Sequence, residues 1–288
     1  MEWKARRLLQ EHELSETPKE GTTEGGLRAS LRTARAWNGN QQSSLTEPLK
    51  KDAVNVMDLL VDGLKKALEM VITGDSEIFA ITLLTLRASF TAIFFSMLIG
   101  IPFGTLIGLT NFPGKKLLLV LINIGMGLPP VVAGLWITIF LWRSGPLGDF
   151  SLLYTPTAIV MAQILVSLPI VTGLTSTAFQ QIDQKLLLQI KALGATKWQT
   201  VWLLLKETKI AILAAIIAGL GRILAEVGAA MMVGGNIQGD TRILTTSIVM
   251  EVSKGNFDVA LALSFILMSL AFIITFLLTF LQQRKRIS

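Results

Sequence analysis

The sequence predicts an all-α polytopic membrane protein with five transmembrane helices, preceded by an amphipathic helix. Hydrophobic residues make up 51% of the 288 residues and charged residues only 16%, whereas soluble domains carry about 25% charged residues. The mean hydropathy is +0.59. Lys and Arg gather in the first 66 residues, in one middle loop and at the C-terminus. The stretches between them are long, nearly uncharged and suited to a lipid bilayer.

Residues 1–52 are polar and predict a disordered extension. No apolar core follows their basic residues, so we do not expect this segment to be a signal peptide. Within residues 53–77, apolar residues recur at helical spacing, and Gly74 and Asp75 end the pattern. We expect this amphipathic helix to lie along the membrane interface rather than to cross the membrane.

Residues 78–281 contain five apolar stretches. A helix rises about 1.5 Å per residue and needs about 20 residues to cross a hydrocarbon core of roughly 30 Å. In lipid the backbone must satisfy its own hydrogen bonds, so continuous apolar runs predict helices. Because the first stretch carries Arg87, we expect its membrane-embedded part to begin near Ser89. The stretches are residues 78–109, 117–142, 154–178, 210–235 and 258–281.

The positions of Lys and Arg predict the orientation of the spans, because basic residues are enriched in cytoplasmic loops. The first loop has Lys115 and Lys116, the third loop has five lysines, and the tail 282–288 has three basic residues. We therefore expect loops one and three and the basic C-terminal tail in the cytoplasm. With five spans, the N-terminus is then outside.

Composition excludes most catalytic chemistry. The chain has no cysteine, and its single histidine, His12, lies in the polar extension, so thiolate chemistry and histidine metal sites are not expected. A P-loop needs G-x-x-x-x-G-K followed by Ser or Thr, but the spacing from Gly108 to Gly114 is one residue too long and Lys116 replaces the hydroxyl. We expect no catalytic residue, metal or cofactor on this chain. The net charge of +6 fits basic membrane loops and not a nucleic-acid site.

The third loop, residues 183–209, is too long for a simple turn. Its pattern predicts one helix over about 183–193, a break at Gly194 and a second helix that begins near Thr196. Two interpretations are open: a helical hairpin that only connects two spans, or a docking element with Trp198 beside the break. We favour the docking element.

The segment KALGATKWQT, residues 191–200, resembles the cytoplasmic loop of binding-protein-dependent ABC importer permeases. In that family the glycine ends a short coupling helix that sits in a groove of a separate ATPase subunit. The segment departs from the family where Leu188, Gln189 and Ile190 replace Glu-Ala-Ala and where Glu207 replaces a late proline. The resemblance implies that the ATPase is contacted by Lys191, Ala192, Leu193, Gly194, Ala195, Thr196, Lys197 and Trp198.

Two further segments narrow the resemblance. GRILAEVGAAMMVGGNI (221–237) and LPPVVAGL (128–135) are most similar to tungstate permeases, followed by molybdate and sulfate permeases. The resemblance implies the permease fold of a type I ABC importer, in which two permease copies work with two ATPase subunits that use ATP-Mg. It further implies an extracytoplasmic oxyanion-binding protein and a place in the cytoplasmic membrane of a bacterium or archaeon.

A function of another class stays open. An ion-coupled secondary transporter would show inverted repeats and acidic residues in the membrane. We find no repeat, and Glu226 is the only acidic candidate. A membrane scaffold without transport would leave the loop around Gly194 unexplained.

Arg222 and Glu226 stand four residues apart in the fourth apolar stretch, which predicts one shared helix face. A charge inside a bilayer costs roughly 2.5–3.5 kcal/mol, so the two are expected to pair. Either the pair fixes helix packing, or Arg222 faces the pathway and attracts an oxyanion. We favour the packing pair.

Prolines and small residues complete the candidates. Pro129, Pro130 and Pro169 are expected to interrupt helices. Small-residue ridges that allow close helix contact are expected at Gly100, Gly104 and Gly108, and at Gly221, Ala225 and Ala229. Thr138, Ser167 and Thr172 either line the pathway or bond to their own helices. The residues expected at the pathway or its gate are Pro129, Pro130, Arg222, Glu226, Gly228 and Asn236.

Overall fold

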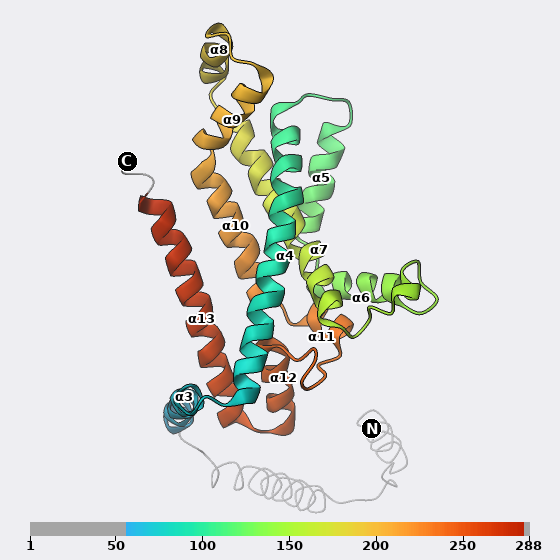
Figure 1. The fold of residues 1–288 in the computed structure, drawn as a ribbon, viewed down its shortest axis with the longest axis vertical. Helices are drawn as coiled ribbons and strands as arrows, with labels where there is room; N and C mark the ends of the chain where they lie inside the picture. The colour runs from blue at the N-terminus through green and yellow to red at the C-terminus, as the bar shows by residue number, and fades with distance from the viewer. Residues whose placement is uncertain (1–55, 285–288) are drawn as a thin grey trace, which may run out of the picture. The chain divides into compact units, whose positions relative to one another are not determined.

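The computed structural model describes residues 56–284, and this part of the chain is built from helices and loops without a strand (Figure 1). The expected disordered extension 1–52 and residues 285–288 of the expected tail lie outside the described residues. The elements are α3 (Val56–Thr73), α4 (Ser76–Leu109), α5 (Lys115–Met126), α6 (Pro130–Leu141), the 3₁₀ turn η1 (Gly148–Phe150), α7 (Pro156–Gln180), α8 (Gln184–Ala192), α9 (Lys197–Glu207), α10 (Lys209–Leu224), α11 (Gly228–Gly234), α12 (Leu244–Lys254) and α13 (Phe257–Arg284).

The amphipathic helix predicted before the first span is confirmed as α3. It ends at Thr73 and is followed by Gly74, whose φ of +66° suits a glycine. The Asp75 side chain then accepts backbone N–H groups at the start of α4. α3 packs on α13, where a Cβ on Gly63 would lie 2.7 Å from the Cβ of Leu261. Lys66 forms an ion pair with Asp258 at the same contact.

Within residues 56–284, three helices, α4, α7 and α13, are long and apolar enough to cross a membrane unaided. The second and fourth predicted spans are instead broken. α5 and α6 meet at an angle of 102°, and α10 and α11 meet at 59°. Five spans result when each bent pair counts as one, so the predicted fold class is confirmed and two of its spans are broken helices.

α4 and α7 form the central pair of this bundle. The predicted ridge on α4 is confirmed, because a Cβ on Gly104 would lie 2.6 Å from the Thr172 carbonyl oxygen and one on Gly108 2.5 Å from Phe179. The hydroxyls of Ser96 and Ser167 bond across the same contact at 2.6 Å. Small residues thus bring the two backbones together, and a buried polar contact joins them.

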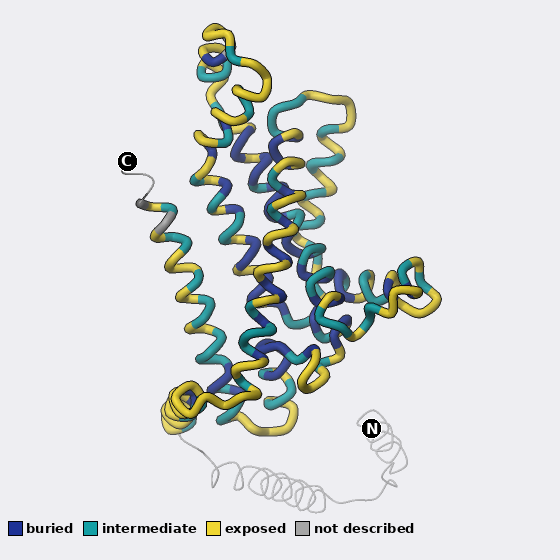
Figure 2. The backbone as a smooth tube through the Cα atoms, in the orientation of Figure 1, coloured by how far each residue is buried: buried dark blue, intermediate teal, exposed yellow. Residues whose placement is uncertain are grey.

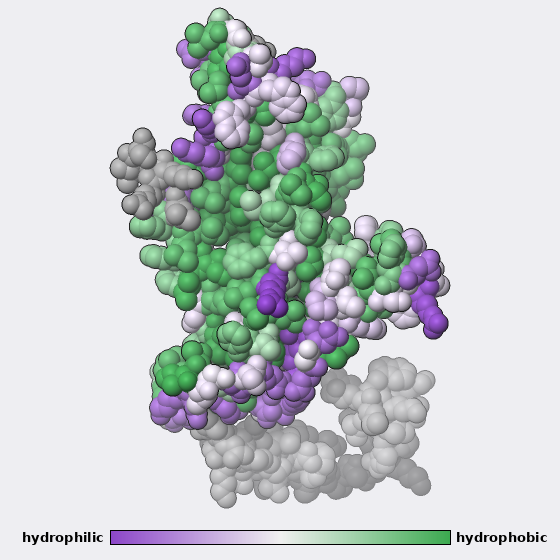
Figure 3. All heavy atoms as spheres, viewed as in Figure 1, coloured by the Kyte–Doolittle hydropathy of each residue, from purple (hydrophilic) through white to green (hydrophobic). Residues whose placement is uncertain are grey.

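Most loops of the described unit gather at two ends, whereas the segment between α6 and α7 projects to one side (Figure 1). α8, α9 and the α4–α5 loop lie at one end, toward which the C-terminal end of α13 points, and α3 and α12 lie at the other. Figure 2 shows buried residues concentrated along α7 and the inner side of α4, with exposed segments at both ends. Figure 3 shows hydrophobic surface between ends where hydrophilic residues collect. This distribution agrees with the predicted alternation of the loops.

Candidate functional site

The third loop folds as the sequence predicts. α8 ends at Ala192, Gly194 adopts a φ of +76°, and Thr196 caps α9. The Thr196 N–H donates to Oε1 of Gln199 at 2.8 Å, and the Gln199 N–H donates to the Thr196 hydroxyl at 3.3 Å. This capping box fixes where the second helix begins, and the left-handed turn at Gly194 reverses the chain before it.

One side of this loop is anchored, and the other side is free. Ile190 is buried with Phe179, Leu204 and Ile212 in a small apolar cluster. Leu193 and Trp198, in contrast, are 87% and 85% exposed. Large apolar side chains held outward on an anchored loop are typical of a surface that another protein covers.

The remaining residues expected at this surface flank the same turn. Ala192, Thr196 and Lys197 are exposed, and Ala195 is half-buried. The backbone of Lys191 belongs to α8, and its side chain lies outside the described part. A feature that sequence reasoning missed is a cleft of about 700 Å³ between this loop and the α4–α5 loop, with Lys115, Asn111 and Thr200 among its lining residues. It joins segments about 80 residues apart, so no local pattern indicates it.

The break in the second span falls at the predicted prolines. α5 ends at Met126 with Gly127 as its C-cap, Pro129 is the N-cap of α6, and Pro130 is the first residue of α6. Proline suits this position because the first N–H groups of a helix have no partner within the helix. The expectation for Pro169 is wrong: α7 continues through it, and Pro169 packs against Gly125, where a Cβ would lie 2.9 Å from its ring.

The break in the fourth span separates Arg222 from Glu226. α10 ends at Leu224, and Glu226 stands between the helices, so the prediction of one shared helix face is wrong. The Glu226 carboxylate is buried and accepts the Ala229 N–H at the start of α11. A carboxylate at that position satisfies an orphan donor and interacts favourably with the helix dipole.

Arg222 lies on another surface. Its side chain is exposed, and within residues 56–284 no salt bridge joins it to Glu226. The expected ridge of Gly221, Ala225 and Ala229 is also wrong, because Gly221 and Ala225 are exposed beside Arg222 while Ala229 is buried. α10 therefore presents a face of small residues with one cation, turned away from the rest of the chain.

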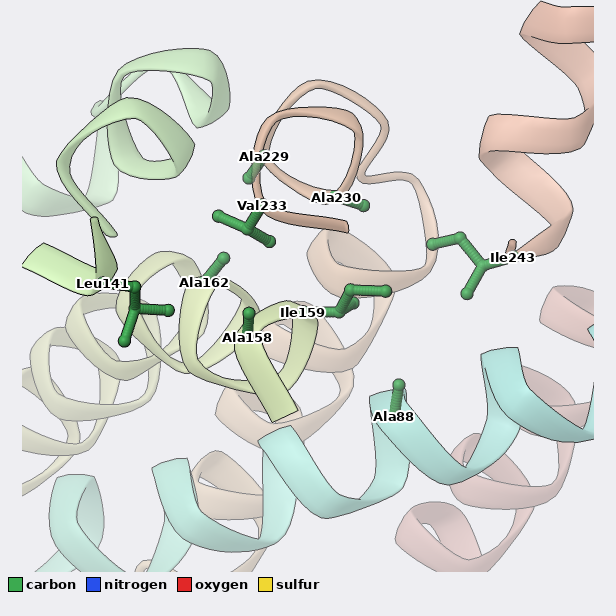
Figure 4. Close-up of a cluster of buried hydrophobic side chains, with 9 residues drawn as sticks. All are labelled: Ala88, Leu141, Ala158, Ile159, Ala162, Ala229, Ala230, Val233 and Ile243. Carbon is green, nitrogen blue, oxygen red and sulfur yellow. The ribbon is translucent and has the colours of Figure 1, made fainter. Parts of the chain in front are cut away.

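The two breaks touch each other. A Cβ on Gly134 of α6 would lie 2.6 Å from Cα of Ala229, and one on Gly228 would lie 2.4 Å from Cγ2 of Val131. Around this contact nine buried side chains from α4, α6, α7, α11 and the start of α12 form one cluster (Figure 4). The cluster contains Ala88, Leu141, Ala158, Ile159, Ala162, Ala229, Ala230, Val233 and Ile243. The prolines of one span and the glycines of the other thus belong to one site.

The polar residues near the breaks mostly bond to backbone. The hydroxyls of Thr138, Ser167 and Thr172 donate to the carbonyls of Gly134, Gln163 and Leu168, each one helical turn earlier. This matches the simpler of the two interpretations of these residues. The Asn236 backbone is left-handed, with φ +53°, so the glycine-rich segment is both the end of α11 and a loop.

Sequence reasoning also missed a polar contact at the opposite end from α8 and α9. Arg242 is paired with Glu77 at 3.0 Å, and Nε2 of Gln238 donates to the same carboxylate at 2.9 Å. The Arg242 side chain is only 11% exposed, so the contact ties the loop after α11 to the start of α4. The residues that form this contact are 165 positions apart in the sequence, so no local spacing predicts it.

Comparison with known proteins places these features in a family. Residues 100–287 match the family described as the binding-protein-dependent transport system inner membrane component. The chain is 36% identical over 227 residues to the tungstate uptake system permease protein TupB of Peptoclostridium acidaminophilum, covering 79% of this chain and all of that protein.

Other relatives extend the range of named substrates. A probable anion ABC transporter permease protein of Haloferax volcanii is 38% identical over 196 residues, covering 66% of this chain and 84% of the relative. The molybdenum transport system permease protein ModB of Escherichia coli is 29% identical over 174 residues, covering 58% and 76%.

The fold also matches a solved structure. A chain from the crystal structure of a bacterial alginate ABC transporter, in complex with an alginate pentasaccharide-bound periplasmic protein, aligns with a TM-score of 0.65. The match covers 87% of this chain and 96% of that one at 18% identity. At this identity the likeness concerns the fold alone.

Proposed function

The chain belongs to the family of binding-protein-dependent transport system inner membrane components, and from this we propose that it is the permease subunit of a tungstate importer. Its fold is that of an ABC importer permease. The observation that carries the choice of cargo is the alignment with a tungstate uptake permease over that protein's whole length.

The location of the diagnostic segments supports this cargo. Segments 128–135 and 221–237 carry the resemblance to tungstate permeases, and they are the segments that contain the two touching breaks. A resemblance in scaffold alone would be expected along the straight helices. Here it falls where backbone at membrane depth is non-helical, which is tolerated where it is buried in protein or lines a cavity.

The exposed face of α10 supports a pathway for an anion. Ala218, Gly221 and Ala225 leave room along this face, and Arg222 adds a positive charge that Glu226 does not neutralise by a direct contact. A cation on a low-dielectric wall attracts an oxyanion over a distance. We place this face between two copies of the chain, with Pro129, Pro130, Glu226, Gly228 and Asn236 forming the gate around it.

The energy comes from a partner in this proposal. The turn at Gly194, with exposed Leu193 and Trp198, docks on an ATPase subunit that binds ATP-Mg. The docking end, including the C-terminus, faces the cytoplasm, and the N-terminus lies outside. The opposite end, where α12 and the Arg242 contact lie, receives the extracytoplasmic binding protein. This chain itself then holds no cofactor.

The docking step has its own test. Trp198→Ala removes an apolar side chain that is 85% exposed in the free chain, so the unfolding free energy of the free chain is expected to stay the same. The amount of ATPase subunit that stays bound to the purified permease is expected to fall about tenfold or more. Trp136→Ala, which removes another exposed tryptophan on α6, is the matched control. Retention lowered equally by both variants would sink the assignment of the docking surface.

The cargo is tested by uptake of labelled tungstate, molybdate and sulfate in cells with and without this chain. We expect tungstate uptake to be lost without the chain and to resist competition by excess sulfate. Molybdate is the second candidate, because the molybdenum permease relative aligns over 174 residues. Uptake that persists when the partner ATPase cannot hydrolyse ATP would favour an ion-coupled transporter and overturn the proposal.

A further inference from the structure

An apolar groove of about 530 Å³ lies between α3, α4 and α13, away from the coupling loop and the breaks. Nearly all of its lining is hydrocarbon, with Ser269 as the one hydroxyl-bearing residue. The lining residues are Leu64, Ala67, Leu68, Val71, Leu86, Phe90, Phe265, Ile266, Ser269, Leu270, Ile273 and Ile274. The proposed transport function leaves this groove unused.

The groove runs along a membrane span. Its α13 wall extends from Phe265 to Ile274, ten residues whose ends are about 14 Å apart at the rise of a helix. This length is close to half of a hydrocarbon core of roughly 30 Å. α3 lies across one end of the wall and is held there by the contact of Gly63 with Leu261 and by the ion pair of Lys66 with Asp258. The groove thus has the direction and length of one leaflet's acyl chain.

Three cations neighbour the lining residues in sequence: Lys65 and Lys66 on α3, which pair with Asp62 and Asp258, and Arg87 on α4. Arg87 lies on α4 between the lining residues Leu86 and Phe90, and it is the only charged residue of the stretch 78–109. Its side chain is exposed, and within the described residues it forms no salt bridge. Because the membrane-embedded part of this helix is expected to begin near Ser89, Arg87 lies at its edge, where a ligand that brings a negative group can pair with it.

Together these observations identify one occupant. We propose that the groove binds an anionic phospholipid, with an acyl chain between α4 and α13 and the phosphate on the Arg87 guanidinium. The planar guanidinium suits bidentate bonding to phosphate, and the long arginine stem can lie along apolar surface while its head stays polar.

The experiment measures lipid retained by the purified full-length chain. The chain is exchanged into detergent and given phosphatidylglycerol or phosphatidylcholine with identical acyl chains, and bound lipid is counted by native mass spectrometry. We expect phosphatidylglycerol to be preferred because its headgroup carries a net negative charge. Arg87→Gln is expected to lower its affinity about tenfold and to lower the affinity for phosphatidylcholine, whose phosphate is offset by choline, by less. Arg143→Gln removes an exposed cation on the loop after α6 and is expected to change the binding of neither lipid.

A second pair of variants tests the groove itself. Ser269→Trp fills it, whereas Met268→Trp places the same ring on a neighbouring side chain that is 63% exposed. Only Ser269→Trp is expected to abolish binding of both lipids. Equal binding of both lipids by all variants overturns the proposal. Loss of a dimer on Ser269→Trp without any lipid-dependent change assigns the groove to a second copy instead. Neither outcome depends on which anion the chain transports.

Discussion

The straight pair α4–α7 and the two broken spans use the same kinds of residue for different ends. Along α4, Gly104 and Gly108 lie in an unbroken helix and bring two long backbones together. In the broken spans, Gly134 and Gly228 lie in the short helices that follow each interruption, α6 and α11, and bring these two helices together.

The two regions differ in which groups form hydrogen bonds with the backbone N–H and C=O groups. In α4 and α7 the helix bonds are internal, and side chains such as Thr172 only add to them. At the start of α11 the Glu226 carboxylate accepts the Ala229 N–H. A small residue in a straight span therefore secures the scaffold, whereas a small residue at a break depends on a neighbouring cap. This contrast makes the broken spans the part of the molecule that a single side chain can disturb.

The largest effect is expected from overfilling the straight pair. In Gly104→Leu the new Cβ would lie 2.6 Å from the Thr172 carbonyl, so α4 and α7 must separate. We expect a loss of about 3 kcal/mol or more in unfolding free energy, measured by denaturant unfolding in detergent. Gly221→Leu is the matched control, because nothing lies within 4 Å of a Cβ there. A Gly104→Leu chain as stable as the control would contradict a rigid α4–α7 scaffold.

A smaller effect is expected at the break. Glu226→Ala leaves the Ala229 N–H without its carboxylate partner, and an unsatisfied buried donor costs about 1–3 kcal/mol. We expect the chain to accumulate in the membrane, while uptake of the transported anion falls. Glu226→Gln keeps an acceptor and is expected to retain more uptake than Glu226→Ala. Equal uptake by the two variants would show that the carboxylate's charge, and not its capping bond, is what the break requires.

The relation of Arg222 to Glu226 sharpens the same comparison. Arg222→Ala removes an exposed cation and is expected to lower the uptake rate roughly tenfold without a loss of stability. Because no salt bridge joins the two residues, the double variant with Glu226→Ala is expected to show both losses, without rescue. Recovery of uptake in the double variant, measured by the same uptake assay, would restore the packing pair predicted from the sequence and remove the pathway role of Arg222.

Sequence patterns located the spans, the turn at Gly194 and the glycine ridge on α4, because hydropathy and spacing are local. They did not locate the end of α10. The run through Ala225 and Val227 stays apolar, and the Glu226 spacing equally suits an unbroken helix. The prediction of a helix break at Pro169 was wrong because α7 continues through this proline, whose ring packs against Gly125.

The smallest effect is expected outside both regions, at Glu251 on α12. Hydrogen bonds from Lys254 and Asn256 lower the pKa of this carboxyl below its usual 4.5. A lowered pKa in the folded state stabilises the protein above about pH 4.5, and the contribution disappears as pH falls toward the folded pKa. Because Lys254 is half-exposed, Glu251→Gln is expected to cost only about 0.5 kcal/mol at neutral pH.

Unfolding of the wild type and the Glu251→Gln variant at pH 7 and pH 4 measures this difference. Ser253→Ala, an exposed change on the same helix, controls for the rest of α12. The gap between wild type and Glu251→Gln should narrow at pH 4, while Ser253→Ala stays parallel to wild type. A gap that widens at low pH would contradict a lowered pKa for Glu251 in the folded state. A gap as large as that of Glu226→Ala would mean that end contacts stabilise the fold as strongly as the breaks do, which the contrast between scaffold and broken spans does not allow.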